Sequence, residues 1–300
     1  MGNNVTDTDN NRPSLVKELL PTAAGGAAGV LTLGIGSIFE KKATSSFENF
    51  AKEQQSNNSI FRKAAVNYMK ENGIDYGDLS EVKYSFLKDI PKSELQDELK
   101  FVNDSFLVKI LKNRPDYLEV IQEGIKGKNA CALRMGLNSK IYANLDESSI
   151  SLFHEIGHCK NNNKFLVELL HLCRTIPKLQ TSLAYLAFVS AILPDIKESD
   201  ENDSKSKNFM RKALKFLNKN CVTLGMLSFL PEIAEEYAAT AKGNKLAKGL
   251  LDNDMYKNVV KHNKKALMTY IVPGIAMTGA IWAAKTVNDT LKKKIANPQN

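Results

Sequence analysis

Two histidines, His154 and His158, lie four residues apart in the segment ISLFHEIGHCK at 150–160, and Glu155 directly follows the first. Residues i and i+4 share one face of an α-helix, so both imidazoles could reach a single ion. A zinc ion held by such ligands lowers the pKa of a bound water to about 7, and the Glu155 carboxylate could then take the proton. The spacing therefore predicts a metal centre that activates water. The alternative is a buried helix whose histidines are simply hydrogen-bonded.

A catalytic zinc site needs a third protein ligand, and the obvious downstream histidines do not supply it. The pattern H-E-x-x-H-x-x-G-x-x-H fails, because Asn161 and Lys164 occupy its glycine and last histidine positions. His171 lies 13 residues after His158 (171 − 158), which on a helix is about 20 Å along the axis. His171 could be a ligand, but on the same helix it would lie far from the pair.

Three glutamates offer a better source of the third ligand. They crowd one predicted helix, LPEIAEEYAATAKG at 230–243, as Glu232, Glu235 and Glu236. The alternative for such a run of charge is a solvated helix face. The histidine motif favours the ligand interpretation.

The sequence around Glu236 resembles that of the gluzincins, zinc peptidases whose third ligand is a glutamate in the pattern E-x-x-A-D. The segment EYAAT at 236–240 matches, except that Thr240 replaces the aspartate. The resemblance implies that His154, His158 and Glu236 bind Zn²⁺, with Glu155 as general base. It also implies that the alanine allows close helix packing and that residue 240 lies just behind the ligands.

A second resemblance precedes the histidine pair. The segments NACA at 129–132 and KIYAN before the motif are similar to those of the heat-shock membrane protease and CaaX-prenyl-protease family. Cys131 stands where an aromatic residue is usual. This resemblance implies that Ala143 and its neighbours hold an extended substrate by strand addition, and that membrane helices lie between the two ligand helices. It covers roughly 129–160 and 230–243.

Long uncharged runs predict contact with a membrane. The runs at 19–39 (39 − 19 + 1 = 21 residues) and 266–284 (284 − 266 + 1 = 19) are long enough to cross a hydrocarbon core. Gly25 and Gly29 form a G-x-x-x-G, which lets helices approach closely in lipid. Lysines flank the second run, as is typical of an anionic membrane surface. The alternative for the first run is a glycine-rich buried hairpin.

Two shorter uncharged runs, 179–194 and 220–231, flank a highly charged segment at 195–212. They could form a hairpin that enters the membrane or a soluble hairpin packed on the core. The longer runs favour an integral, multi-pass membrane protein that contacts lipid.

The elements that position the chemistry are predicted to be mostly helical. Apolar residues at three and four spacing indicate helices at 61–72, 93–112 and 115–125, and a turn signal within 130–145 indicates a hairpin of strands. We therefore predict an α+β fold, mostly α, with a zincin-like core, a small sheet and added hydrophobic helices. The expected segments are a flexible N-terminus (1–18), a hydrophobic segment (19–42), a helical region (43–128), a catalytic region (129–265) with an inserted hydrophobic hairpin (165–230), and a hydrophobic helix with a basic tail (266–300).

Composition narrows the class of protein. The apolar fraction of 43% is that of a folded chain, and the net charge of +8 comes from dispersed lysines. No nucleic-acid motif is present, so we expect no nucleic-acid partner. The four cysteines show no C-x-x-C spacing, which argues against a disulfide framework or a cysteine zinc site.

Together these features predict a membrane-associated zinc endopeptidase acting on an unfolded, misfolded or membrane-linked polypeptide. Two alternatives stay open: a non-catalytic, membrane-anchored helical scaffold with a vestigial or structural metal site, and a soluble peptidase whose apolar segments are all core. Candidates to stabilise the oxyanion are His262, Tyr256 and Tyr237, none of them with a spacing signal. The sequence does not indicate an oligomeric state.

Overall fold

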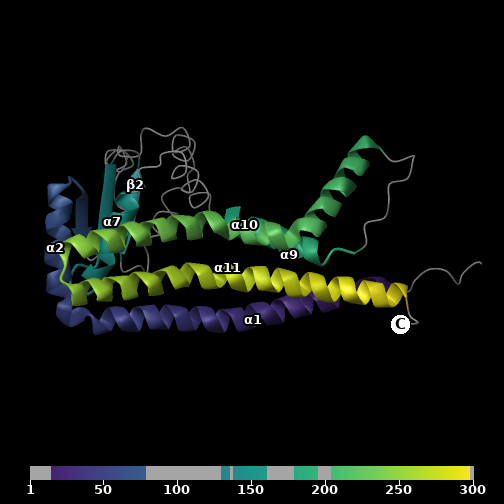
Figure 1. Ribbon diagram of the computed structural model, residues 1–300. Helices are drawn as coiled ribbons and strands as arrows, with labels where there is room; N and C mark the ends of the chain where they lie inside the picture. Colours follow the sequence, from purple (N-terminus) through teal and green to yellow (C-terminus); the bar gives the residue numbers. More distant parts are fainter. Residues whose placement is uncertain (1–14, 79–129, 136–137, 161–178, 195–203, 298–300) are drawn as a thin grey trace, which may run out of the picture. The chain divides into compact units, whose positions relative to one another are not determined.

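A computed structural model shows that the chain is mostly helical, with one small sheet (Figure 1). It describes residues 15–78, 130–135, 138–160, 179–194 and 204–297. The helices are α1 (Leu15–Glu53), α2 (Asn58–Glu71), α7 (Leu152–Cys159), α9 (Leu179–Ala191), α10 (Lys205–Leu250) and α11 (Asn253–Ala296), and the strands are β1 (Asp75–Asp78), β2 (Ala130–Met135) and β3 (Asn138–Ala143). The prediction of a mostly α chain with a small sheet is confirmed.

Some predictions fall outside the described residues. These are the flexible start of the chain, the helices at 93–112 and 115–125, and the placement of His171. The predicted helix at 61–72 corresponds to α2, and the predicted strand hairpin at 130–145 corresponds to β2 and β3.

The chain divides into two compact units. The first, which we call the site unit, comprises 39–180 and 229–272; the second, the apolar unit, comprises 1–38, 181–228 and 273–300. Helices α1, α10 and α11 contribute residues to both.

The core of the site unit forms where α2 meets α7 and the sheet. Phe61, Ala65 and Met69 repeat every four residues on α2, so they form one apolar face, and all three are fully buried. Phe61 meets Phe153 of α7 edge to face, with ring centroids 6.3 Å apart. Ile141 of β3 belongs to the same cluster, which therefore fixes α7 between a helix and the sheet.

The sheet has the order β1-β3-β2, with β3 parallel to β1 and antiparallel to β2. Ala143 pairs with Asp78 on one side and Ala130 on the other, so its strand is central. The expectation that Ala143 holds a substrate strand is therefore wrong. Strand β1, which the sequence did not predict, pairs with β3 on the side opposite to β2. Gly77 of β1 leaves room for the Tyr142 ring, because a Cβ on Gly77 would lie 3.1 Å from that ring. Among the described strands, β2 lies at an edge with β3 as its neighbour.

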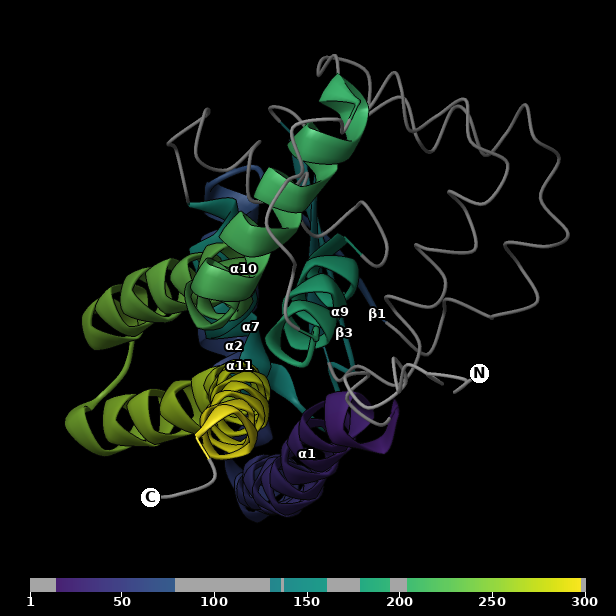
Figure 2. The same cartoon turned by 90° about the vertical axis from the view of Figure 1, so that its right-hand side faces the viewer.

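In the apolar unit, segments of α1, α9, α10 and α11 lie beside one another (Figure 2). Most of its fully buried residues are small or polar, with Ile281 as an exception, and many of its large apolar side chains are exposed. Asn288 is fully buried and donates to the carbonyls of Ala191 and Leu193, and Asn218 donates to the carbonyl of Ser190. The large side chains exposed on this unit include Leu20, Val30, Leu31, Ile35, Leu186, Val189, Met226, Ile275 and Trp282. This distribution is typical of helices that pack against one another in lipid.

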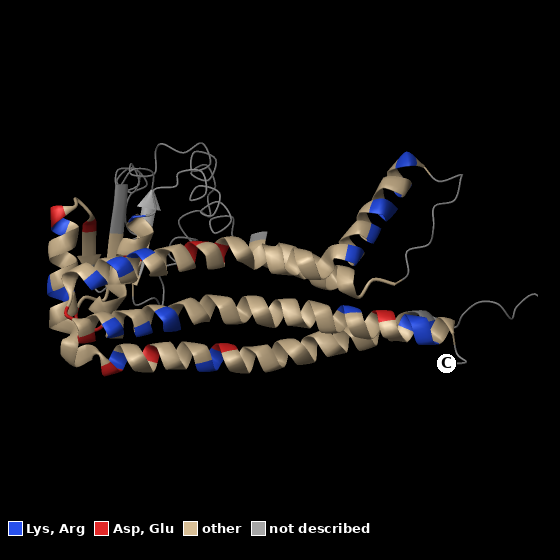
Figure 3. Cartoon of the chain, viewed as in Figure 1, with Lys and Arg blue, Asp and Glu red and all other residues tan. Residues whose placement is uncertain are grey.

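Helices α1 and α11 are each long and apolar enough to cross a membrane, by length and composition. Charged residues are absent from the middle of both helices (Figure 3). Glycines let them approach each other: a Cβ on Gly25 would lie 2.7 Å from the carbonyl oxygen of Ala284, and one on Gly36 would lie 2.3 Å from the Ala276 Cβ. A Cβ on Gly29 would meet the Phe188 ring at 2.4 Å, so the G-x-x-x-G lies at helix contacts.

Helix α10 differs from the expected segmentation. The sequence predicts three separate segments here: a charged segment, a short apolar run that ends at Pro231, and a helix that carries the glutamates. A boundary is expected at Pro231 because a proline inside a helix removes one backbone hydrogen bond. In the structure α10 continues through Pro231 as one helix of 46 residues. The glutamates therefore lie on the same helix as the apolar run.

Candidate metal centre

Helix α7 carries the histidine pair in an almost wholly buried position. Leu152, Phe153 and Ile156 are fully buried on its core side. The chain enters α7 through a 3-10 turn at Ser149–Ser151, which is held by Asn58: the Asn58 amide donates to the Leu145 carbonyl and its oxygen accepts from the backbone N–H of Ser149, both at 2.7 Å. Apolar packing and this clamp together set the direction of the two imidazoles.

Helices α7 and α10 touch backbone to backbone at two glycines. A Cβ on Gly157 would lie 2.0 Å from the carbonyl oxygen of Ala239, and a Cβ on Gly243 would lie 2.3 Å from that of Phe153. Ala239 is itself fully buried. The position that the resemblance assigns to close helix packing is thus where the two ligand helices meet.

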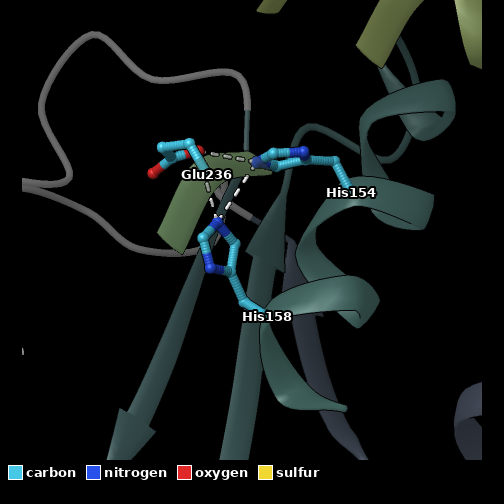
Figure 4. Close-up of side chains that lie close together, drawn as sticks. All are labelled: His154, His158 and Glu236. Atoms are coloured by element: carbon cyan, nitrogen blue, oxygen red, sulfur yellow. Dashed lines mark hydrogen bonds and ion pairs between the residues drawn. The ribbon is translucent and has the colours of Figure 1, made fainter. Parts of the chain in front are cut away.

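The three predicted ligands converge from these helices on one point (Figure 4). His154 Nε2 lies 2.9 Å from Glu236 Oε2 and 3.1 Å from His158 Nε2, and His158 Nε2 lies 3.5 Å from Glu236 Oε2. The side chain of Glu236 is only 1% exposed. The solvated-face alternative is therefore wrong for Glu236.

This donor set fits a divalent ion. In a tetrahedral site with bonds of about 2.0–2.1 Å to nitrogen and oxygen, neighbouring ligand atoms lie about 3.3 Å apart. The three observed separations of 2.9, 3.1 and 3.5 Å lie around that value. Two imidazoles and one carboxylate, with a fourth position for water, form the ligand set of catalytic rather than structural zinc.

The cluster also favours a positive charge. Burial alone would lower the pKa of His158, but the charge of Glu236 and hydrogen bonds to Glu235 and Glu236 outweigh it and raise the pKa to about 10. A cation between converging lone pairs in a buried place offsets the free-energy cost of burying them. A proton or a metal ion can supply that charge.

Thr240 holds the first histidine from behind. Its hydroxyl lies 3.3 Å from His154 Nδ1, and the residue is 7% exposed. A hydroxyl that accepts a hydrogen bond from Nδ1–H keeps the proton on that nitrogen and leaves Nε2 free to bind a metal. Groups behind metal-binding histidines commonly have this role. Thr240 thus occupies the place where the gluzincin pattern has an aspartate, with a neutral group in place of a charged one.

Replacing Thr240 by valine is expected to weaken zinc binding by about 10- to 100-fold, because the valine keeps the shape but loses the acceptor for His154. Thr240→Ser keeps the hydroxyl and should bind zinc nearly as tightly as the wild type. Competition with a chromophoric chelator measures both affinities. Equal affinities for the valine and serine variants would show that the hydroxyl does not orient the histidine.

Glu235 supports the second histidine, a role that sequence analysis missed. Its Oε1 lies 3.5 Å from His158 Nδ1, and the residue is 8% exposed. A carboxylate behind a ligand histidine orients the ring and raises its basicity. The only signal in the sequence is that Glu235 directly precedes Glu236, which assigns it no partner.

Glu155 lies on α7 between the histidines and is 9% exposed. Its charge is close enough to His158 to raise the pKa of that histidine. A carboxylate beside the ligands is where a general base for a metal-bound water must lie.

The three candidate oxyanion donors lie in different surroundings. His262 is 1% exposed and lies 3.3 Å from Ser151 Oγ at the entrance of α7; burial lowers its pKa to about 4, so it is neutral there. Tyr256 packs against the core cluster. Tyr237, beside Glu236, is 62% exposed. His262 is therefore buried and neutral, and Tyr237 is the most exposed of the three.

A cluster of two histidines and a glutamate is not specific to one family. No protein-family model, curated protein or solved structure matches the chain. A functional assignment therefore depends on the donor atoms, their hydrogen-bond partners and their surroundings.

Proposed function

We propose that the chain is a membrane-associated zinc endopeptidase of the gluzincin type. The observation that carries the proposal is the convergence of His154 Nε2, His158 Nε2 and Glu236 Oε2 within 3.5 Å of one another, beside Glu155. The histidine motif alone occurs in unrelated proteins. The buried Glu236 carboxylate, which comes from another helix, adds a third donor to that motif.

Each residue has a defined part in hydrolysis. His154, His158 and Glu236 would hold a zinc ion, which would lower the pKa of a water and polarise the scissile carbonyl. Glu155 would accept a proton from water and deliver it to the leaving amine. Thr240 and Glu235 keep the two imidazoles oriented through their Nδ1 atoms.

The sheet supports a polypeptide as substrate. Helix α7 packs directly on β2, and β2 lies at an edge of the described sheet. An extended peptide added beside β2 would pair through its backbone and present its carbonyls near the ligands. This replaces the expected contact with Ala143 by one with the strand Ala130–Met135.

The apolar unit supports an integral, multi-pass protein. Its exposed surface carries large apolar side chains, whereas most of its fully buried residues are small or hydrogen-bonded. The substrate would then be an unfolded or membrane-linked polypeptide that reaches the centre close to a bilayer.

Metal analysis tests the proposal. The purified wild type should carry one zinc ion and cleave unfolded casein, and both His158→Ala and Glu236→Ala should lose the zinc and the cleavage. Glu232→Ala is the matched control, because this half-buried glutamate lies on the same helix outside the ligand set. Zinc retained by both ligand variants would refute the centre. Zinc without cleavage in the wild type would instead favour the non-catalytic scaffold.

A further inference from the structure

A basic hollow lies on the site unit between the end of α1 and the beginning of α11. Its volume is about 390 Å³. It is lined from α1 by Lys42, Ser45, Ser46, Asn49, Phe50 and Glu53, and from α11 by Lys261 and Lys265. Nothing in the proposed hydrolysis uses these residues.

Two of the lysines are held in place by Phe50. The Lys261 ammonium lies 4.5 Å and the Lys265 ammonium 5.7 Å from the centroid of its ring. Phe50 is 4% exposed and belongs to the core cluster, so the core packing holds its ring in place. Lys265 also donates to the Ser46 hydroxyl. Cation–π contacts of this kind favour these positions of the two ammonium groups before any ligand binds.

The charge of the hollow is unbalanced. None of Lys42, Lys261 and Lys265 forms an ion pair with a carboxylate in the described part of the chain, although Glu53 lines the hollow. Three ammonium groups around one space repel one another unless an anion occupies it. Hydroxyl and amide donors beside lysines are the groups that bind a phosphate.

The position of the hollow along the two helices favours a lipid headgroup as the source of a phosphate ligand. Lys42 follows the uncharged run that ends at Phe39, and Lys265 directly precedes the run that begins at Ala266. Residues just outside a membrane span lie at the level of lipid headgroups. Lysines at this level attract anionic lipids.

We propose that this hollow binds the phosphate of one anionic phospholipid headgroup. The inference rests on the membrane insertion of α1 and α11, which is part of the proposed function, and does not depend on the metal centre. It gives the protein a preference for anionic over zwitterionic lipid.

The test compares phosphatidylglycerol with phosphatidylcholine in nanodiscs, with native mass spectrometry counting the lipids retained by the full chain. The wild type should retain one phosphatidylglycerol in preference to phosphatidylcholine. A variant with Lys42→Gln, Lys261→Gln and Lys265→Gln should bind it about a hundredfold more weakly, because each lysine contributes about 1 kcal/mol and 1.4 kcal/mol is a factor of ten. Lys63→Gln with Lys245→Gln and Lys248→Gln removes the same charge from exposed positions of the same unit and should change nothing.

Three further results separate the outcomes. Resistance of the chain to alkaline extraction from phosphatidylcholine vesicles reports insertion, so an inserted wild type without lipid preference would overturn this inference and leave the peptidase proposal intact. An equal loss in both triple variants would show a diffuse charge effect and also overturn it. Inorganic phosphate that raises the melting temperature of the lipid-free wild type as much as phosphatidylglycerol does would assign the hollow to free phosphate.

Discussion

Glu155→Gln is expected to lower peptide hydrolysis by about 10²- to 10⁴-fold while the zinc content stays at the wild-type level. Glutamine keeps the size and polarity of the side chain but cannot accept the proton of a metal-bound water, and general-base catalysis contributes a factor of this size. The zinc ligands His154, His158 and Glu236 are untouched. Turnover of a fluorogenic peptide, measured beside zinc analysis of the same sample, checks both parts of the prediction.

The comparison with His158→Ala sharpens this result, because that variant should lose the metal and the activity together. Wild-type turnover in Glu155→Gln would remove the proposed mechanism, whatever the zinc content. Loss of zinc in Glu155→Gln would show that the buried carboxylate shapes the ligand set and does not act as a base.

Gly157→Ala is expected to separate the two ligand helices. The new methyl group would lie 2.0 Å from the carbonyl oxygen of Ala239 and 2.8 Å from its carbon, and these backbone atoms cannot turn away as a side chain can. Overpacking of this kind costs about 1–3 kcal/mol or more of folding free energy. Since His158 and Glu236 come from opposite helices, zinc affinity should fall with stability. Thermal unfolding in detergent and chelator competition measure the two losses.

Gly249→Ala is the matched control for this experiment. Gly249 lies near the end of α10, with open space where its Cβ would be. Alanine there should raise helix stability by up to about 1 kcal/mol and leave zinc binding unchanged. If the alanine variants of Gly157 and Gly249 had the same melting temperature and zinc affinity, the close approach of α7 and α10 would not matter for the centre.

Local patterns could be predicted from the sequence. The histidine pair depends on a helical spacing of four residues, and α7 has it. The hairpin of β2 and β3 depends on a turn signal between two short runs. The resemblance of EYAAT to a known pattern predicts Glu236 as the third ligand, and in the structure its carboxylate lies within 3.5 Å of both imidazoles.

Features set by distant parts of the chain could not be predicted. Strand β1 has two aspartates and a glycine, and only its pairing with β3 makes it a strand. Glu235, the partner of His158, comes from α10 and carries no motif signal, so its role depends on how two helices cross. Pro231 predicts the end of a helix, but in the structure α10 continues through it.

The order in which the ligands are synthesised has a consequence for biogenesis. Glu236 follows His154 by 82 positions, and residues 181–228 between them belong to the apolar unit. A nascent chain therefore exposes two imidazoles long before it has a third donor, and contacts between distant positions form slowly. If the centre is hydrolytic, an unfinished chain on the ribosome carries no working protease, and the cell is protected from premature proteolysis by chain order alone.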